Sequence, residues 1–155
     1  MGARGRHRHQ PNLGNVLDAP LEGKWAPPAQ QRYFSDYKKA GFKSVRVPVR
    51  WDQHTSKAPP YLIDTTFLDR VEQVIDWSLG QNLSTIVNTH HDDWLDGAAN
   101  DTAFDVQLDR LVSIWTQVAT RLSSKDQRLL AFEVGLDRVR AHARVGTHAD
   151  RCLLH

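Results

Sequence analysis

The apolar positions of the chain repeat with two different spacings between residues 27 and 134. They recur at helical spacing in three windows, which cover 27–41, 64–80 and 104–122. Between these windows lie short apolar runs rich in β-branched residues, typical of buried strands, at 44–49, 83–89 and 129–134. Strands that alternate with helices of this length predict βαβ units, and therefore an α/β fold with a parallel sheet.

Residues that favour helix ends mark the boundaries of the expected helices. Pro27 and Pro28 suit a first helical turn, and the carboxylate of Asp64 can cap the next helix. We expect Gly41 to end the first helix in a left-handed conformation and Gly80 to end the second. The third helix is expected to bury one stripe, made of Phe104, Leu108, Leu111, Trp115, Val118 and Leu122.

The sequences of the expected strands predict a sheet with two chemically different faces. Side chains alternate along a strand, so one face receives Val45, Val47 and Val49. The opposite face receives Arg46, Asn88 and His90, close to the carboxyl ends of the strands, where α/β proteins place their sites. Two plainer interpretations stay open: an ion pair between Arg46 and a core carboxylate, and a satisfied core histidine at His90.

The stretch "TIVNTHHDDWLD" (85–96) follows a strand-like run with unusual polar residues. It fits a metal site, the wall of a polar cleft or an ordinary solvated turn. A metal hydrolase would be centred on His90, His91 and Asp92. Adjacent histidines on an extended strand point in opposite directions, however, which favours the cleft wall and predicts no metal.

Composition narrows the classes of function. The chain has 155 residues, a formal net charge of +2 and a single cysteine, Cys152, so we expect one domain without an intrachain disulfide. Arginines gather at the two ends rather than along a stripe, which argues against nucleic acid, and no segment resembles a membrane span. Residues 1–11 are basic but lack the apolar run of a signal peptide, and we expect this lead-in to be disordered.

Four segments, 12–25, 41–51, 85–95 and 129–134, together resemble glycoside hydrolase family 5, the cellulase-like endo-glycanases, and most of all its fungal members. The likeness runs over 12–134. It implies the N-terminal half of a TIM (β/α)8 barrel, about the first four strands with three helices. It also implies retaining hydrolysis of β-linked polysaccharides without a cofactor, and an extracellular location.

The resemblance assigns roles to individual residues. Arg46 matches the family arginine that hydrogen-bonds the nucleophilic carboxylate, and His90, with His91 beside it, matches a histidine that lines the glycone subsite. The remaining sugar-contacting positions lie on loops, and they are Asn15, Asp18, Trp25, Trp51 and Trp94. Packing in the core or in a loop is the alternative for each tryptophan.

The family pattern breaks after residue 134. Glu133 matches a non-catalytic glutamate of the family, and Asp137 occupies the position of the acid/base without its supporting asparagine. The nucleophile belongs to a seventh strand that this sequence lacks, so we expect no hydrolysis by this chain, and a non-catalytic carbohydrate-binding protein is the alternative. We expect a disordered, non-matching tail over 135–155, an Arg46 without its carboxylate partner, and self-association through exposed strand edges.

Overall fold

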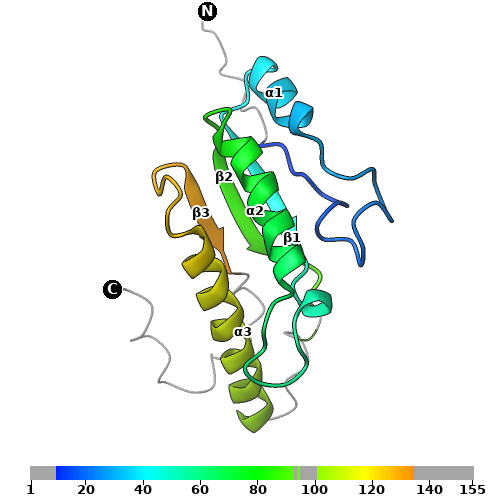
Figure 1. Cartoon of the computed structure of the whole chain (residues 1–155), viewed down its shortest axis with the longest axis vertical. Helices are drawn as coiled ribbons and strands as arrows, with labels where there is room; N and C mark the ends of the chain where they lie inside the picture. The colour runs from blue at the N-terminus through cyan, green and yellow to red at the C-terminus, as the bar shows by residue number, and fades with distance from the viewer. Residues whose placement is uncertain (1–9, 93, 95–100, 135–155) are drawn as a thin grey trace, which may run out of the picture.

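The computed structural model describes residues 10–92, 94 and 101–134, and within them the chain forms a small α/β layer (Figure 1). The helices are α1 (Gln31–Lys39), α2 (Thr65–Leu79) and α3 (Asp101–Leu122), with a short 3-10 turn, η1 (Asp52–His54). The strands are β1 (Ser44–Val49), β2 (Ser84–Thr89) and β3 (Leu130–Glu133), which form one parallel sheet in the order β1-β2-β3. The prediction of a parallel α/β fold with three helices is confirmed.

The strand register separates an apolar face from a polar one, as the alternation predicts. Val47 pairs with Val87, and Val87 pairs with Phe132, in one row across the sheet. The two valines of this row are fully buried in the core that α2 and α3 share with the sheet. Arg46 pairs with Ile86 in the next row, so its side chain leaves from the opposite face.

The segment ahead of β1 differs from the expected lead strand. Residues 11–13 run parallel to β1, but they make a single bridge, at Asn12 and Arg46. Its hydrogen bonds join Leu13 N–H to Arg46 O at 2.8 Å and Arg46 N–H to Pro11 O at 2.9 Å. The chain then turns away, and Asn15 takes a left-handed φ of 64° that no strand can continue. The described residues therefore contain three strands where four were predicted, and a single bridge takes the place of the first.

α1 begins at Gln31, after the two prolines that were expected to form its first turn. The residues before it are held by partners distant in sequence. Ala29 donates its N–H to Glu22 Oε1 at 2.8 Å, and its carbonyl accepts from Arg70 Nη2 at 2.9 Å. These two bonds tie the backbone of Ala29 to Glu22 and to Arg70 of α2, so α1 begins only after them, at Gln31. At the other end, Gly41 takes a φ of 85°, so its left-handed conformation is confirmed.

α2 begins as predicted and ends differently. The carboxylate of Asp64 accepts from the N–H of Phe67 at 2.8 Å, which confirms the N-cap. Gly80 is the C-cap but keeps a right-handed φ of −61°, and Asn82 supplies the left-handed residue with φ 52°. Asparagine tolerates this conformation because its short polar side chain can hydrogen-bond locally.

Four residues of the expected α3 stripe are buried in the core, namely Leu111, Trp115, Val118 and Leu122, whereas Phe104 is only partly buried. Leu108 is 39% exposed, whereas Ile114 is buried and joins the core. The N-terminal part of α3 extends beyond the strands, so this part of the helix has less of the sheet beside it (Figure 1). No helix among the described residues is long and apolar enough to cross a membrane.

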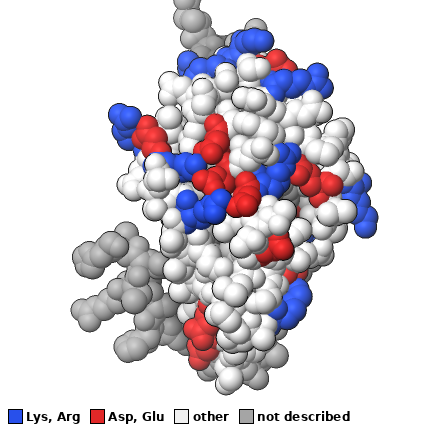
Figure 2. Space-filling view, viewed as in Figure 1, with Lys and Arg blue, Asp and Glu red and all other residues white. Residues whose placement is uncertain are grey.

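Charged side chains link α2 to the end of α3 on the outer surface, where Figure 2 shows acidic and basic groups side by side. Lys125 lies 2.7 Å from Glu72 and 2.8 Å from Asp76, and Arg121 pairs with Asp69 and Glu72. Ion pairs this close to solvent each contribute little to the free energy of unfolding. Their effect is to align the two helices over the sheet.

Candidate functional site

The site forms where β2 ends. The N–H of His90 donates to Val49 O at 2.9 Å, which holds the residue against the end of β1. His91 then takes a left-handed φ of 54°, and the two imidazole rings lie together with centroids 4.3 Å apart. The expectation that adjacent histidines point in opposite directions is therefore wrong, because it assumes extended backbone and His91 leaves that conformation.

Asp18 meets these histidines from the loop before α1. Its side chain is 2% exposed, and its Oδ1 accepts from the N–H of Val16 at 2.8 Å. The other oxygen, Oδ2, lies 3.8 Å from Nε2 of His91. Trp25 sets its ring edge-on to His91, at a centroid distance of 5.5 Å, and remains 46% exposed. The fold thus brings together four of the predicted sugar-contacting residues, namely Asp18, Trp25, His90 and His91.

Both histidines are accessible to solvent, but His90 is partly buried and His91 is exposed. Burial lowers the pKa of His90, and the neighbouring His91 and Arg46 lower it further. His90 is therefore neutral near pH 7, so one ring nitrogen donates and the other accepts a hydrogen bond. A neutral imidazole beside a buried carboxylate can therefore accept a hydrogen bond from a hydroxyl group and donate one to it.

Asp92, the third residue of the metal-hydrolase hypothesis, has a structural role. Its side chain is 4% exposed and accepts from the backbone N–H groups of Trp51 at 3.3 Å and Asp52 at 2.9 Å. Burial raises the pKa of Asp92 to about 6, against the lowering effect of these two hydrogen bonds. Asp92 joins the loop after β1 to the loop after β2, and Asp18 takes the place beside the histidines that the hypothesis gave to Asp92.

The three tryptophans of the predicted site have different environments. Trp51 is fully buried, with its ring against Phe67 and Trp115 at centroid distances of 6.0 and 6.2 Å. The packing alternative therefore holds for Trp51, and we correct its assignment from sugar contact to core. Trp94 is partly buried, and the guanidinium of Arg110 lies 4.4 Å from its ring centroid, which covers part of that ring. Trp25 has the most open ring of the three.

Arg46 has a carboxylate partner, contrary to the expectation that it would be unpaired. Its guanidinium donates to the two oxygens of Glu133 at 2.8 and 3.1 Å. This hydrogen bond is the main reason that the pKa of Glu133 is lowered. Arg46 therefore forms an ion pair, as the alternative predicted, but with a half-exposed carboxylate in place of a core one. The strand alternation contained the signal, since Arg46 and Glu133 both leave from the polar face, two rows of the register apart.

The remaining polar candidates lie outside the cluster. Asn15 is exposed on its left-handed turn. Asn88, on the polar face of β2, is buried, and its amide donates to Thr89 O at 3.1 Å. Asp137 falls outside the described residues.

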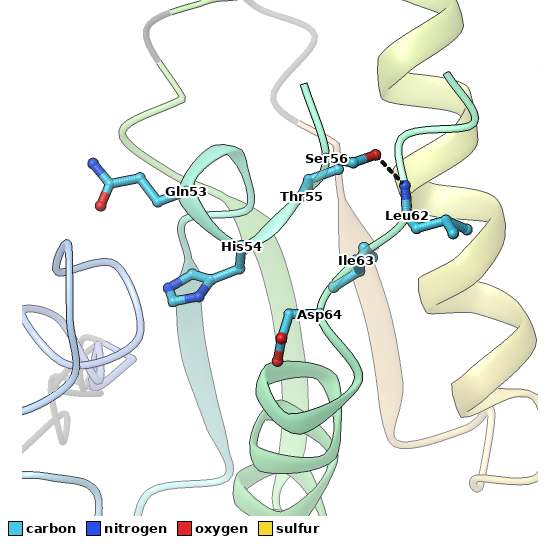
Figure 3. Close-up of a pocket in the computed structure, with 7 residues that line it drawn as sticks. All are labelled: Gln53, His54, Thr55, Ser56, Leu62, Ile63 and Asp64. Atoms are coloured by element: carbon cyan, nitrogen blue, oxygen red, sulfur yellow. Dashed lines mark hydrogen bonds between the residues drawn. The ribbon is translucent and has the colours of Figure 1, made fainter. Parts of the chain in front are cut away.

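A hollow lies in the loop between β1 and α2, and sequence reasoning missed it. It is a shallow, open depression of about 410 Å³, lined by Gln53, His54, Thr55, Ser56, Leu62, Ile63 and Asp64 (Figure 3). Ser56 Oγ accepts from the N–H of Leu62 at 2.8 Å, which closes the loop on itself. The ring of His54 is stacked on Phe67 at 3.6 Å, so this depression is shaped by loop packing.

Parallel strands joined by helices, with polar side chains gathered where the strands end, are the arrangement of the α/β enzymes that carry their sites at this edge of the sheet. The family model described as cellulase (glycosyl hydrolase family 5) matches residues 11–135. The chain belongs to glycosyl hydrolase family 5.

Individual proteins agree with this assignment. Endoglucanase H of Acetivibrio thermocellus is 51% identical over 123 residues, which cover 79% of this chain and 13% of that protein. A tri-modular subfamily 4 endo-β-1,4-glucanase of Bacillus licheniformis superposes with a TM-score of 0.75 at 45% identity, over 81% of this chain and 25% of that one. Endoglucanase Cel5A of Thermotoga maritima gives a TM-score of 0.71 at 35% identity, over 81% and 38% of the two chains.

This chain therefore spans a small part of each relative and reproduces part of their TIM barrel. The proteins named here are bacterial, so they lend no support to the expected likeness to fungal members.

Proposed function

We propose that this chain forms the N-terminal part of the catalytic barrel of an extracellular endo-β-1,4-glucanase, and that Asp18, Trp25, His90 and His91 contact the glucan. The observation that carries the proposal is the convergence of these four residues at the ends of the strands. Related proteins have been seen with sugars: the Bacillus licheniformis enzyme with cellotetraose, and Thermotoga maritima Cel5A with cellobiose and with mannotriose.

The chemistry of the cluster suits a pyranose chain. The open ring of Trp25 offers an apolar face on which a sugar ring can stack. The buried Asp18 carboxylate accepts hydrogen bonds from hydroxyl groups, and the neutral His90 both donates and accepts them. A buried carboxylate contributes most when its hydrogen-bond geometry is fixed, and the bond from Val16 fixes that of Asp18.

Bond cleavage needs more than this cluster. Retaining glycosidases use two carboxyl groups about 5 Å apart, one as acid/base and one as nucleophile. In this chain Glu133 is tied to Arg46 in a two-bond ion pair, and the acid/base position holds Asp137. We infer that these 155 residues contribute to glucan binding and do not cleave the glycosidic bond by themselves.

Two measurements test the proposal. The purified chain should release no reducing ends from β-glucan, and release that disappears in Asp137→Ala would overturn the inference of inactivity. A hybrid should carry residues 11–134 of this chain in place of the matching segment of the Bacillus licheniformis enzyme. We expect the hybrid to hydrolyse cellotetraose, with His90→Ala lowering kcat/KM on the order of 100-fold and Trp25→Ala lowering it about tenfold. A folded hybrid indifferent to both changes would contradict the assigned site.

The alternative, a non-catalytic carbohydrate-binding protein, relies on a platform of Trp25, Trp51 and Trp94. The burial of Trp51 and the Arg110 contact of Trp94 leave little of that platform open. Titration of the chain with cello-oligosaccharides, followed by tryptophan fluorescence, separates the two functions. A tight, saturable change in the isolated chain would favour the binding protein.

A further inference from the structure

The carboxylate and the two imidazoles of the site also form a set of metal-ligand atoms. One ligand atom from each of Asp18, His90 and His91 lies within 4.8 Å of the other two. We propose that these three residues bind a divalent transition-metal ion of the zinc type. The proposal adds a ligand of a different chemical class to the site assigned above to sugar.

The spacing of the three residues is close to that of a bound ion. Zinc lies about 2.0–2.2 Å from imidazole nitrogen and carboxylate oxygen, so two ligand atoms of a tetrahedral site are about 3.3–3.6 Å apart. Oδ2 of Asp18 and Nε2 of His91 are 3.8 Å apart, which is slightly wider than this and too long for a direct hydrogen bond. His91 is exposed, so its side chain has room to rotate and shorten this distance.

The Asp18 carboxylate and the backbone of both histidines are held in place before any ion arrives. Asp18 is buried and is held through Oδ1 by the N–H of Val16, which leaves Oδ2 to face the histidines. The N–H of His90 is bonded to Val49 O, and the left-handed turn at His91 places the second ring beside the first. Metal affinity rises when ligands are oriented in this way by the groups behind them.

The donor set selects the kind of ion. Two imidazoles and one carboxylate suit Zn²⁺, Co²⁺ or Ni²⁺, whereas Mg²⁺ and Ca²⁺ prefer sites built of oxygen alone. The positive charge of Arg46, which acts on His90, is offset by the two-bond pair with Glu133. Three protein ligands leave the remaining coordination position open to water.

Metal and glucan would then compete, a consequence that rests on the proposed function. An ion held between Asp18 and the histidines occupies the groups that we assign to sugar hydroxyls. Added Zn²⁺ should therefore weaken glucan binding or hydrolysis by the hybrid enzyme described above, and a chelator should restore it.

The direct test uses the full chain and no sugar. Its background must first be removed, because further histidines and the cysteine outside the described residues can also bind metal. Glutamine replaces each of these histidines, and serine replaces the cysteine. The residues are His7, His9, His142, His148, His155 and Cys152. Zn²⁺ binding by calorimetry and the visible absorption of tetrahedral Co²⁺ then report the site. We expect one equivalent to bind.

Ligand variants and a matched control complete the test. Asp18→Asn keeps the Oδ1 acceptor for Val16, and His91→Asn keeps a residue that tolerates a left-handed φ. Both variants, and His90→Gln, should weaken Zn²⁺ binding by at least about tenfold. His54→Gln, a change to the histidine stacked on Phe67, should leave it unchanged.

Near-UV circular dichroism establishes that each variant is folded. Absence of stoichiometric binding, or binding indifferent to all three ligand changes, would overturn the metal site. Either result would leave the sugar site to be judged by the hybrid enzyme.

Discussion

β2 and β3 are neighbours in one sheet, with regular hydrogen bonding between them, yet their side chains have very different environments. Val87 of β2 is fully buried, while Phe132, its partner in the register of β3, is 39% exposed. β2 has a strand on each side, and its apolar face packs into the core with α2. β3 is bordered by β2 alone within the described residues. Strands of a parallel sheet become buried when neighbours and helices cover them, so hydrogen bonding alone does not create a core.

The largest effect should come from two aromatic rings that share Trp115 as a neighbour. Trp51 is fully buried against Trp115, whereas Phe132 contacts the same ring from the exposed strand. We expect Trp51→Ala to lower the free energy of unfolding by about 3–5 kcal/mol, and Phe132→Ala by about 1 kcal/mol. Urea denaturation followed by circular dichroism measures both. Equal losses would show that β3 is buried to the same extent as the rest of the sheet.

A smaller loss is expected at the carboxylate that joins the two loops of the site. Asp92→Ala leaves the N–H groups of Trp51 and Asp52 without their acceptor, at a cost of about 2–3 kcal/mol in the free energy of unfolding. Asp92→Asn retains one acceptor oxygen and should cost less. If the alanine variant unfolds at the same urea concentration as the parent chain, Asp92 does not secure these loops.

The pair on the polar face should contribute less again. Arg46 and Glu133 are hydrogen-bonded through two atoms, but Glu133 is half exposed. A double-mutant cycle with Arg46→Met and Glu133→Gln should give a coupling free energy of about 0.5–1 kcal/mol, as for other solvent-accessible pairs. A coupling near zero would place β3 energetically outside the sheet.

The smallest expected effect is the contribution of Glu22 to the pH dependence of the free energy of unfolding. Burial alone would raise the pKa of Glu22, but hydrogen bonds from Arg70 and the Ala29 N–H outweigh it and lower the pKa below 4.5. A lowered carboxyl pKa stabilises the folded state above pH 4.5, and this contribution is lost as pH falls through the folded-state value. Unfolding free energies measured between neutral and acidic pH should therefore decrease on acidification, and Glu22→Gln should reduce that decrease. If the free energy of unfolding of Glu22→Gln varies with pH as it does in the parent chain, Glu22 does not contribute to this dependence.

Much of the fold could be predicted because it depends on local rules. The Asp64 cap and the left-handed Gly41 follow from residue chemistry within a few positions. The division of the sheet into a valine face and a face with Arg46 follows from the two-residue repeat of any strand. The same repeat placed Asn88 with Arg46, and the sugar-contacting roles of Asp18 and His90 came from resemblance to the family.

The sequence by itself determined which elements form and which residues share a face, because these properties depend on spacing along the chain. Only the tertiary structure decided that the rings of His90 and His91 face the same partner, that Trp51 belongs to the core and that Glu133 neutralises Arg46. Each of these outcomes depends on a left-handed turn or on a contact between residues far apart in the chain. Such contacts are set by which strands become neighbours in the sheet and by how helices and loops pack over it, and spacing along the chain alone encodes neither.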